Sequence, residues 1–335
     1  MILVTGGTGL VGAHLLYKLA SSNKKVKAIY RNERKLSNVK SVFSCYTPNY
    51  EPIFNAIEWI EADILDIPAL SEVFKNVTHV YHCAAFVSFE PNKYQLLRQT
   101  NIEGTANIVN LCITNSIEKL CYVSSIATLG SEINNNPVNE DTIWNPEADN
   151  NVYAITKYGA EMEVWRGTQE GVNAVIVNPG VILGAGIWRY GTGSLFKKAH
   201  KGLKYYTSGS IALIAVEDVV TIMIKLLESQ ITNECFVLVA ENWTYKDFLQ
   251  ALAKSVNAKL PNKLASTWLL NMAWKLDWLK HKLTRKRRQL TKHLAHSLSS
   301  ETDYNNTKIK TALNYQFKPI NETIIAIGNL YQKQA

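Results

Sequence analysis

Tyr153 and Lys157 are two residues of this chain whose types and spacing suggest chemistry. They stand four positions apart in "NVYAITKYGAE", and positions i and i+4 share one face of a helix. A tyrosine hydroxyl can transfer a proton, but its ordinary pKa is about 10, so ionisation near neutral pH requires a nearby positive charge. The lysine can supply that charge. Because the same spacing also occurs on ordinary solvated helices, the rest of the sequence has to decide between the two interpretations.

A glycine-rich turn follows directly after the first apolar run of the chain. The segment "ILVTGGTGLVG" places Gly6, Gly9 and Gly12 between a predicted strand and a predicted helix. Glycines let the backbone approach a pyrophosphate, and the N-terminus of the helix offers free N–H groups. The alternative is a simple tight turn between strand and helix. The context predicts a dinucleotide site, with cofactor contacts from Gly6, Thr8, Gly9, Leu10, Val11 and Gly12.

The end of the second predicted strand, "KVKAIY", bears on the choice of cofactor. An acid at this position would hold the 2′-hydroxyl of NAD, but the sequence continues with Arg31. A guanidinium group suits a 2′-phosphate, so NADP(H) is favoured, with NAD(H) possible. The alternative role for Arg31 is to cap a surface turn.

Predicted strands and helices alternate through the first two thirds of the chain. This order is typical of a Rossmann-type α/β fold, a doubly wound parallel sheet, here with a smaller C-terminal substrate-binding lobe. We expect residues 1–180 to form the NAD(P)-binding domain, rejoined by about 211–240. Residues 181–210 and 241–335 are expected to form the lobe.

Several motifs occur in the order found in one enzyme family. They are "TGGTGLVG", Asp63, the "CAA" after the fourth strand, Asn101 in "TNIEGT", "SS" in "VSSIATLG", "YAITK" and "NPGVILG". Together they resemble the extended short-chain dehydrogenase/reductases, also called the NAD-dependent epimerase/dehydratase family. The resemblance covers residues 1–240 well and the C-terminal third loosely. "VYHCAAFVSF" and "VSSIATLG" are most similar to the dihydroflavonol-reductase and 3β-hydroxysteroid-dehydrogenase-like branch.

The resemblance implies a role for each motif residue. Tyr153 would be the general acid/base, and Lys157 would lower its pKa and bind the nicotinamide ribose. Ser125, with Ser124 as the alternative, would hydrogen-bond the substrate oxygen, and Asn101 would support a proton relay. Further cofactor contacts are expected from Asp63, which would accept from the adenine amino group, and from Ile64, Cys83, Ala84, Ala85, Ser124, Pro179 and Gly180.

The expected substrate is a small molecule, and the candidate pocket residues are aromatic and apolar, which suits a hydrophobic carbonyl or alcohol. Plain core packing is the alternative for each of them. The candidates are Phe86, Val87, Ser88, Ser125, Val181, Trp188, Tyr190 and Tyr206.

The leading functional hypothesis is an NAD(P)-dependent oxidoreductase that interconverts a carbonyl and a secondary alcohol. The acidic pair of the family's dehydratases is replaced by Ile126 and Ala127, which disfavours sugar dehydration. Ile211 and Ala212 stand where nucleotide-sugar members carry an Arg-Asp pair, which counts against a nucleotide sugar. A sugar epimerase with tightly bound NAD(P) and a non-catalytic NADP sensor remain as alternatives, and the family analogy suggests a homodimer.

Charge and composition limit the possible partners and location. The net charge is +8, of which +7 lies between Lys275 and Ser300, so no nucleic-acid surface is expected. The five cysteines are scattered without metal-ligand spacing, and we expect no metal and no disulfide framework. The start of the chain does not have the pattern of an export signal, and no apolar run is long enough to cross a bilayer. A cytoplasmic location is therefore expected.

The segment 268–292 combines apolar residues at helical spacing with a basic run. Trp268, Met272, Leu276, Leu279 and Leu283 would share one helix face. The favoured interpretation is an amphipathic helix that packs this face over the substrate lobe and leaves a basic face solvated. The alternative is a peripheral helix that contacts an anionic membrane without inserting stably.

Overall fold

A seven-stranded parallel sheet forms the centre of the computed structural model, which describes residues 1–334 except 133–135, 285–287 and 289. The strand order is β10-β6-β5-β4-β1-β2-β3. The reversal of order next to β1 makes the sheet doubly wound, as the alternation of elements predicts. The strands are β1 (Ile2–Thr5), β2 (Val26–Tyr30), β3 (Glu58–Glu61), β4 (His79–His82), β5 (Lys119–Val123), β6 (Ala174–Pro179) and β10 (Glu234–Leu238).

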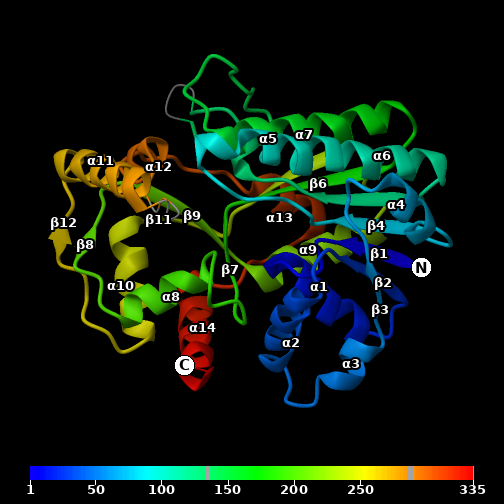
Figure 1. The fold of residues 1–335 in the computed structure, drawn as a ribbon, viewed down its shortest axis with the longest axis horizontal. Coiled ribbons are helices and arrows are strands. Elements are labelled where there is room, and N and C mark those ends of the chain that lie inside the picture. Colours follow the sequence, from blue (N-terminus) through cyan, green and yellow to red (C-terminus); the bar gives the residue numbers. More distant parts are fainter. Residues whose placement is uncertain (133–135, 285–287, 289, 335) are drawn as a thin grey trace.

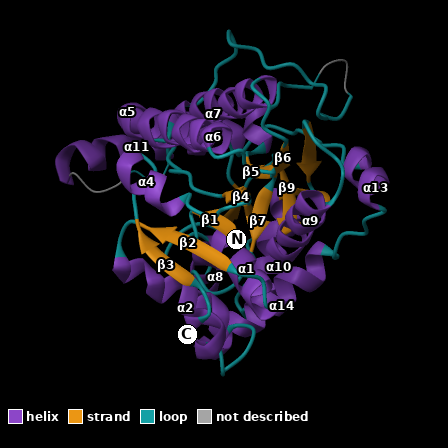
Figure 2. Cartoon of the chain, turned by 90° about the vertical axis from the view of Figure 1, so that its right-hand side faces the viewer, coloured by secondary structure: helices purple, strands orange, loops and turns teal. Residues whose placement is uncertain are grey.

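Helices cover both faces of this sheet (Figures 1 and 2). One face packs into a core with α1 (Leu10–Ser21), α2 (Leu36–Ser44), α3 (Glu51–Asn55) and α9 (Val216–Glu228). The other face packs with α4 (Ile67–Val73), α6 (Gly104–Thr114) and α7 (Val152–Gln169). The short α5 (Tyr94–Leu97) leads through a π-helical segment, Arg98–Glu103, into α6. The sheet is buried on both faces, which explains the nearly continuous apolar runs of its central strands.

The smaller lobe is built around a second sheet of order β11-β9-β7. Its strands are β7 (Val181–Leu183), β9 (Ser210–Ala215) and β11 (Glu241–Thr244), and β8 (Tyr205–Tyr206) pairs separately with β12 (Lys263–Leu264). The lobe core packs α8 (Gly193–His200), α10 (Tyr245–Ser255) and α14 (Ile320–Gln334) against this sheet. Helices α11 (Thr267–Thr284) and α12 (Lys292–Ser297) lie at one end of the molecule (Figure 1).

The division between the two parts differs in detail from the expected boundaries. Helix α9 and strand β10 return the chain to the large sheet, but β9 pairs with β7 and β11 in the small one. Helix α13 (Thr307–Leu313), within the range expected for the lobe, packs on β10 instead. Ile309 of this helix is fully buried in the core of the large domain. A contact between chain segments this far apart leaves no local signal in the sequence.

The favoured interpretation of α11 is wrong about the direction of its apolar face. Leu270 is the one residue of α11 that is buried. Leu276 is 60% exposed and Leu283 is 76% exposed, and Trp268, Met272 and Leu279 on the same face are exposed too. Apolar periodicity identifies a helix face but does not say whether protein covers it. No helix among the described residues is long and apolar enough to cross a membrane.

We predict that Ile309→Ala destabilises the large domain. The substitution leaves a cavity in a fully packed core, which costs about 2–5 kcal/mol of unfolding free energy. Thermal and denaturant unfolding of the whole chain measure this loss. Ile325→Ala on the exposed face of α14 is the matched control, with an expected change below about 0.5 kcal/mol. Equal effects of the two substitutions would show that α13 does not complete the core.

Candidate active site

The glycine turn brings β1 into close contact with the end of β4. Gly6 has a φ of +68°, and a Cβ atom there would lie 2.5 Å from the backbone nitrogen of Ala84. A Cβ atom on Gly12 would collide with the carbonyl oxygen of Gly6. Helix α1 follows Gly9 with no side-chain cap and no acid in its first turn. Its first N–H groups therefore suit an anion, and the turn fits the pyrophosphate of a dinucleotide.

Thr8, Leu10 and Val11 complete this turn and are half-buried. Next to the turn, Cys83 donates its N–H to the Thr5 carbonyl, and the Ala84 N–H donates to the Thr5 hydroxyl. Burial raises the pKa of the Cys83 thiol to about 12, so this group is neutral. The chain after β4 thereby lies against the glycine turn, where Ala84 and Ala85 are expected to contact the cofactor.

Arg31 and Asp63 lie close together at the ends of β2 and β3. An Arg31 guanidinium nitrogen lies 3.4 Å from Asp63 Oδ2, and Asp63 Oδ1 accepts from the Leu65 N–H. Arg31 is 49% exposed and Asp63 39%, so the pair contributes at most about 1 kcal/mol. Arg31 and Asp63 can therefore leave this weak ion pair and bind a ligand instead. Neighbouring Ile64 is buried, packs on Gly104 and has its carbonyl held by Asn107.

Ser125 and Tyr153 meet at the carboxyl end of β5. Ser125 Oγ accepts from the Ala127 N–H at 3.1 Å at the start of the short helical turn that follows β5. Burial raises the pKa of Tyr153 above its ordinary value, and the hydrogen bond from Ser125 opposes this shift. In this structure the tyrosine is a neutral hydroxyl that can donate a proton.

Lys157 lies one turn further along α7 and is buried. Its ammonium donates to the Tyr122 hydroxyl at 2.6 Å and to the Val123 carbonyl at 2.9 Å. Burial lowers the pKa of Lys157 to about 7, and the charge of Glu161 acts in the opposite direction. The expected lowering of the Tyr153 pKa is therefore not found here, because Lys157 is directed to the end of β5 and is charged for only part of the molecules near neutral pH.

Glu161 forms a buried network that the sequence analysis does not identify. Its Oε2 accepts from Ser124 Oγ at 2.5 Å, from Thr128 Oγ1 at 2.8 Å and from Asn178 Nδ2 at 2.8 Å. The hydroxyl of Ser124 is thus committed to a carboxylate, and the role of Ser125 at the substrate oxygen stays a prediction. The available signal was the position of Glu161, four residues after Lys157 and so on the same face of α7.

Asn101 joins the loop after β4 to α7. It lies in the π-helical segment, a feature that often marks functional sites. Its Oδ1 accepts from the Phe86 N–H at 2.8 Å, and its Nδ2 donates to the Phe86 carbonyl and to Thr156 Oγ1. Asn101 therefore positions the wall next to Tyr153. The relay role expected from the resemblance stays a prediction.

The predicted pocket residues do not all come together. Phe86 and Ser88 lie in the loop after β4, and Phe89 of the same loop packs edge-on against the Tyr153 ring at 5.4 Å. Phe89 was not among the predicted residues. Val87 of this loop is 52% exposed. This loop therefore supplies an apolar surface directly next to the proton donor.

The remaining candidates lie on other elements. Trp188 packs against Phe196 and Tyr331 in the lobe core, and Tyr190 accepts a hydrogen bond from Asn38. Tyr206 on β8 lies beneath the Lys246 ammonium. Pro179 and Val181 flank Gly180, where a Cβ atom would lie 2.7 Å from the carbonyl oxygen of Ala212 in β9. Contact of these residues with cofactor or substrate stays a prediction.

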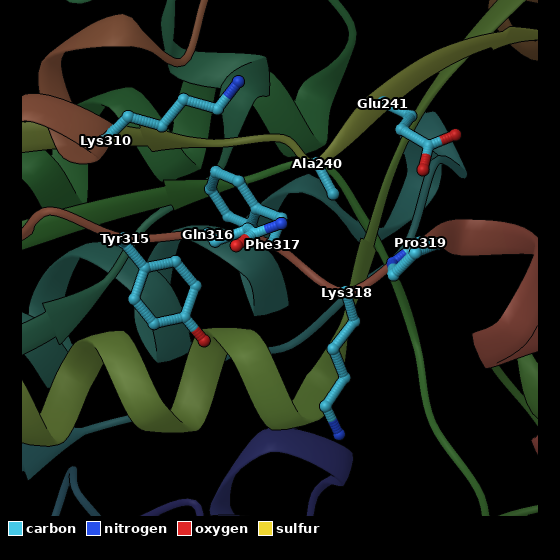
Figure 3. Close-up of a pocket in the computed structure, with 8 residues that line it drawn as sticks. All are labelled: Ala240, Glu241, Lys310, Tyr315, Gln316, Phe317, Lys318 and Pro319. Atoms are coloured by element: carbon cyan, nitrogen blue, oxygen red, sulfur yellow. The ribbon is translucent and has the colours of Figure 1, made fainter.

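A surface pocket of about 390 Å³ lies on the α9 side of the large sheet, the face opposite α7 (Figure 3). The segment 315–319 forms most of it, with Ala240, Glu241 and Lys310. Asp218 accepts from the Tyr315 hydroxyl and the Lys318 N–H, and Glu241 accepts from the Ile320 N–H. These contacts attach the C-terminal segment to the domain, and Tyr153 lies elsewhere. Among the described residues, no His, Cys, Asp and Glu cluster could hold a metal ion.

Comparison with known proteins decides the family. Residues 2–238 match the model of the NAD dependent epimerase/dehydratase family. The chain belongs to this family. It is an NAD(P)-dependent enzyme of the extended short-chain dehydrogenase/reductase type, which confirms the resemblance carried by its motifs.

Relatives within the epimerase/dehydratase family have different activities. The chain is 26% identical over 257 residues to sterol demethylase protein B of Methylococcus capsulatus, covering 75% of this chain and 73% of the relative. It is 25% identical to tetraketide alpha-pyrone reductase 2 of Arabidopsis thaliana, covering 68% and 73%. The structure of a UDP-glucose 4-epimerase of Thermotoga maritima with UDP-glucose has a TM-score of 0.77, covering 99% of both chains. Its 18% identity shows the shared fold alone.

We predict that the affinity for NADH falls as the pH rises through about 7, because the neutral amine of Lys157 would lose the charge-assisted contact expected between its ammonium and the ribose. Fluorescence titration between about pH 6 and pH 9 measures this dependence. Tyr122→Phe removes an acceptor of the ammonium, so the loss should begin at lower pH.

Lys157→Met is the control for this titration, since it should bind weakly with no pH dependence in this range. A flat profile for the natural protein would show that Lys157 does not titrate near neutral pH.

Proposed function

We propose that this enzyme is an NADP(H)-preferring oxidoreductase that interconverts a carbonyl and a secondary alcohol on a small apolar molecule. The observation that carries the proposal is the grouping of Ser125, Tyr153 and Lys157 at the carboxyl ends of the parallel strands. This edge of the sheet also carries the glycine turn that fits a dinucleotide.

Tyr153, Ser125 and Lys157 have different roles at the substrate oxygen. The nicotinamide cofactor supplies or accepts the hydride when it is bound. In reduction, Tyr153 donates its proton to the carbonyl oxygen, and Ser125 orients that oxygen by a hydrogen bond. Lys157 turns from Tyr122 towards the ribose and places its positive charge close to Tyr153. That charge stabilises the tyrosinate that remains after proton donation.

The preference for NADP(H) is supported by Arg31. Its ion pair with Asp63 is exposed and weak, so a 2′-phosphate can replace the carboxylate as the partner of the guanidinium. Asp63 then becomes available for the adenine amino group. In this arrangement Arg31 binds the 2′-phosphate on the ribose, and Asp63 binds the amino group of the adenine base.

The apolar character of the substrate is supported by two features. The loop after β4 packs Phe89 against the Tyr153 ring and leaves Val87 exposed. On the lobe side, Ile211 and Ala212 are buried in β9, where nucleotide-sugar members would carry a cation. An apolar carbonyl compound fits these surroundings better than a diphosphate.

We predict that Tyr153→Phe lowers carbonyl reduction by about 10²–10⁴-fold, because the proton donor is lost, and leaves NADPH affinity unchanged. Loss of NADPH absorbance over a panel of apolar aldehydes and ketones measures turnover. The matched control is Tyr158→Phe on the same helix, where the ring stacks on Trp144 and full activity is expected.

Nucleotide sugars belong in the same panel. Isomerised sugar without net consumption of cofactor would identify an epimerase instead. Cofactor binding with no turnover of any panel member would favour a sensor, and undiminished activity of Tyr153→Phe would exclude the mechanism.

We predict that Arg31→Ala weakens NADPH binding by about 10- to 100-fold, the value of a charged hydrogen bond, and barely changes NADH binding. Titration with both cofactors measures the ratio. Lys40→Ala is the control, since the Lys40 ammonium lies over the Phe54 ring. An unchanged ratio in Arg31→Ala would overturn the preference for NADP(H).

A further inference from the structure

Helix α11 lies at one end of the molecule (Figure 1). One of its faces is an apolar stripe that is exposed to solvent. Successive residues of a helix are turned by about 100°, so spacings of four, four, three and four residues keep one side. The exposed fractions along it range from 40% for Met272 to 76% for Leu283. The stripe consists of Trp268, Met272, Leu276, Leu279 and Leu283.

The opposite face of α11 already has its partners. Leu270 packs in a small core with Ala265 and Ala295, joined by Leu269, Trp274 and Leu290. Asp277 accepts from the Leu290 N–H at 3.1 Å. These contacts attach α11 to α12, so the outward direction of the stripe is fixed by the packing of the other face.

Basic residues flank the stripe on both sides. Lys275 and Lys282 lie on one side and Lys280 on the other, and all three are exposed. The Lys282 ammonium lies 5.3 Å from the centre of the Trp278 ring, which is 46% exposed. The segment from Lys275 to Ser300 carries +7 of the net charge of +8. Long lysine side chains next to tryptophan rings are typical of a surface at a membrane interface.

From this surface we propose that α11 docks parallel to an anionic lipid bilayer, with the apolar stripe entering the boundary between headgroups and acyl chains. Charge decides between lipid and a second copy of the chain. Two copies joined through α11 would bring two strongly basic segments together, whereas anionic headgroups neutralise them. The proposal also explains why the positive charge is concentrated in this segment, since the rest of the chain carries +1.

The docked helix would lie beside the approach to the proposed active site. His293 of α12 lies 3.6 Å from the carboxylate of Asp149, four residues before Tyr153. Helix α12 packs against the inner face of α11 and so links the docked helix to the loop that leads into α7. Entry of an apolar substrate from the lipid on this side of the molecule rests on the proposed function, but the docking itself does not.

Co-sedimentation of the full chain with vesicles tests the docking. Phosphatidylcholine vesicles with about 30% phosphatidylglycerol should bind the protein, vesicles of phosphatidylcholine alone should bind it far less, and high salt should weaken binding. Leu276→Gln with Leu283→Gln should reduce partitioning by about ten-fold or more. Both residues are exposed, so the fold is unaffected. Ile325→Gln, an exposed apolar residue of α14, is the matched control and should bind as the natural protein does.

A second pair of variants separates this surface from general basicity. Lys275→Gln with Lys282→Gln should weaken binding several-fold, whereas Lys197→Gln with Lys198→Gln on α8 removes the same charge without effect. Equal loss in both pairs, or no binding to anionic vesicles, would overturn the proposal. A dimer in gel filtration that Leu276→Gln with Leu283→Gln converts to a monomer, without vesicle binding, would assign the stripe to a second copy. Binding is read without turnover, so its failure is distinct from failure of the enzymatic proposal.

Discussion

Two buried ionisable side chains on one face of α7 hold the candidate active site together. Lys157 is 1% exposed and Glu161 is 6% exposed, and they lie one helical turn apart. A buried charge is costly unless hydrogen bonds replace the lost water. The Lys157 ammonium finds its partners at the end of β5, and the Glu161 carboxylate finds its partners around the ends of β5 and β6. The helix can therefore take only one rotation and one height relative to the sheet.

The position of Tyr153 follows from this constraint. One turn before Lys157, the tyrosine reaches the same strand ends, next to Ser125. Thr156 on the neighbouring face accepts a hydrogen bond from Asn101. Asn101 also hydrogen-bonds both the N–H and the carbonyl of Phe86. The proton donor, its serine partner and the apolar wall are thus placed by one helix. A shift of α7 would disturb all three together, since their supporting hydrogen bonds share its residues.

The sequence predicts the parts of the site that depend on local chemistry. The glycine turn, the Tyr-Lys spacing and the two serines are short patterns with a physical reason, and the structure places them at one edge of the sheet. The contact between Ser124 and Glu161, which bears on the choice between Ser124 and Ser125, depends on the fold and leaves no local pattern in the sequence. Tyr122 could not be identified as a site residue from the sequence, because it lies in an apolar strand and follows the same pattern as its neighbours. Its hydroxyl becomes important only through the hydrogen bond from Lys157, which the fold provides.

The same limit explains the errors outside the site. Ile309 belongs to the large domain because α13 returns to β10, a contact between residues more than seventy positions apart. For α11, the apolar period is real, but six of its large apolar residues face away from the protein while Leu270 alone is buried. A pattern of apolar residues indicates that a helix face is unfavourable in water. It does not indicate whether the rest of the protein or another partner covers that face.

The small core between α11 and α12 is sufficient to orient the helix but not to cover it. Its buried members are Ala265, Leu270 and Ala295, two of which have minimal side chains. A larger apolar contact at this interface would draw the stripe inward and remove the surface from solvent. The narrow inner face therefore leaves the broad outer face exposed. In this way the packing of a few small residues determines the direction of the basic, apolar surface.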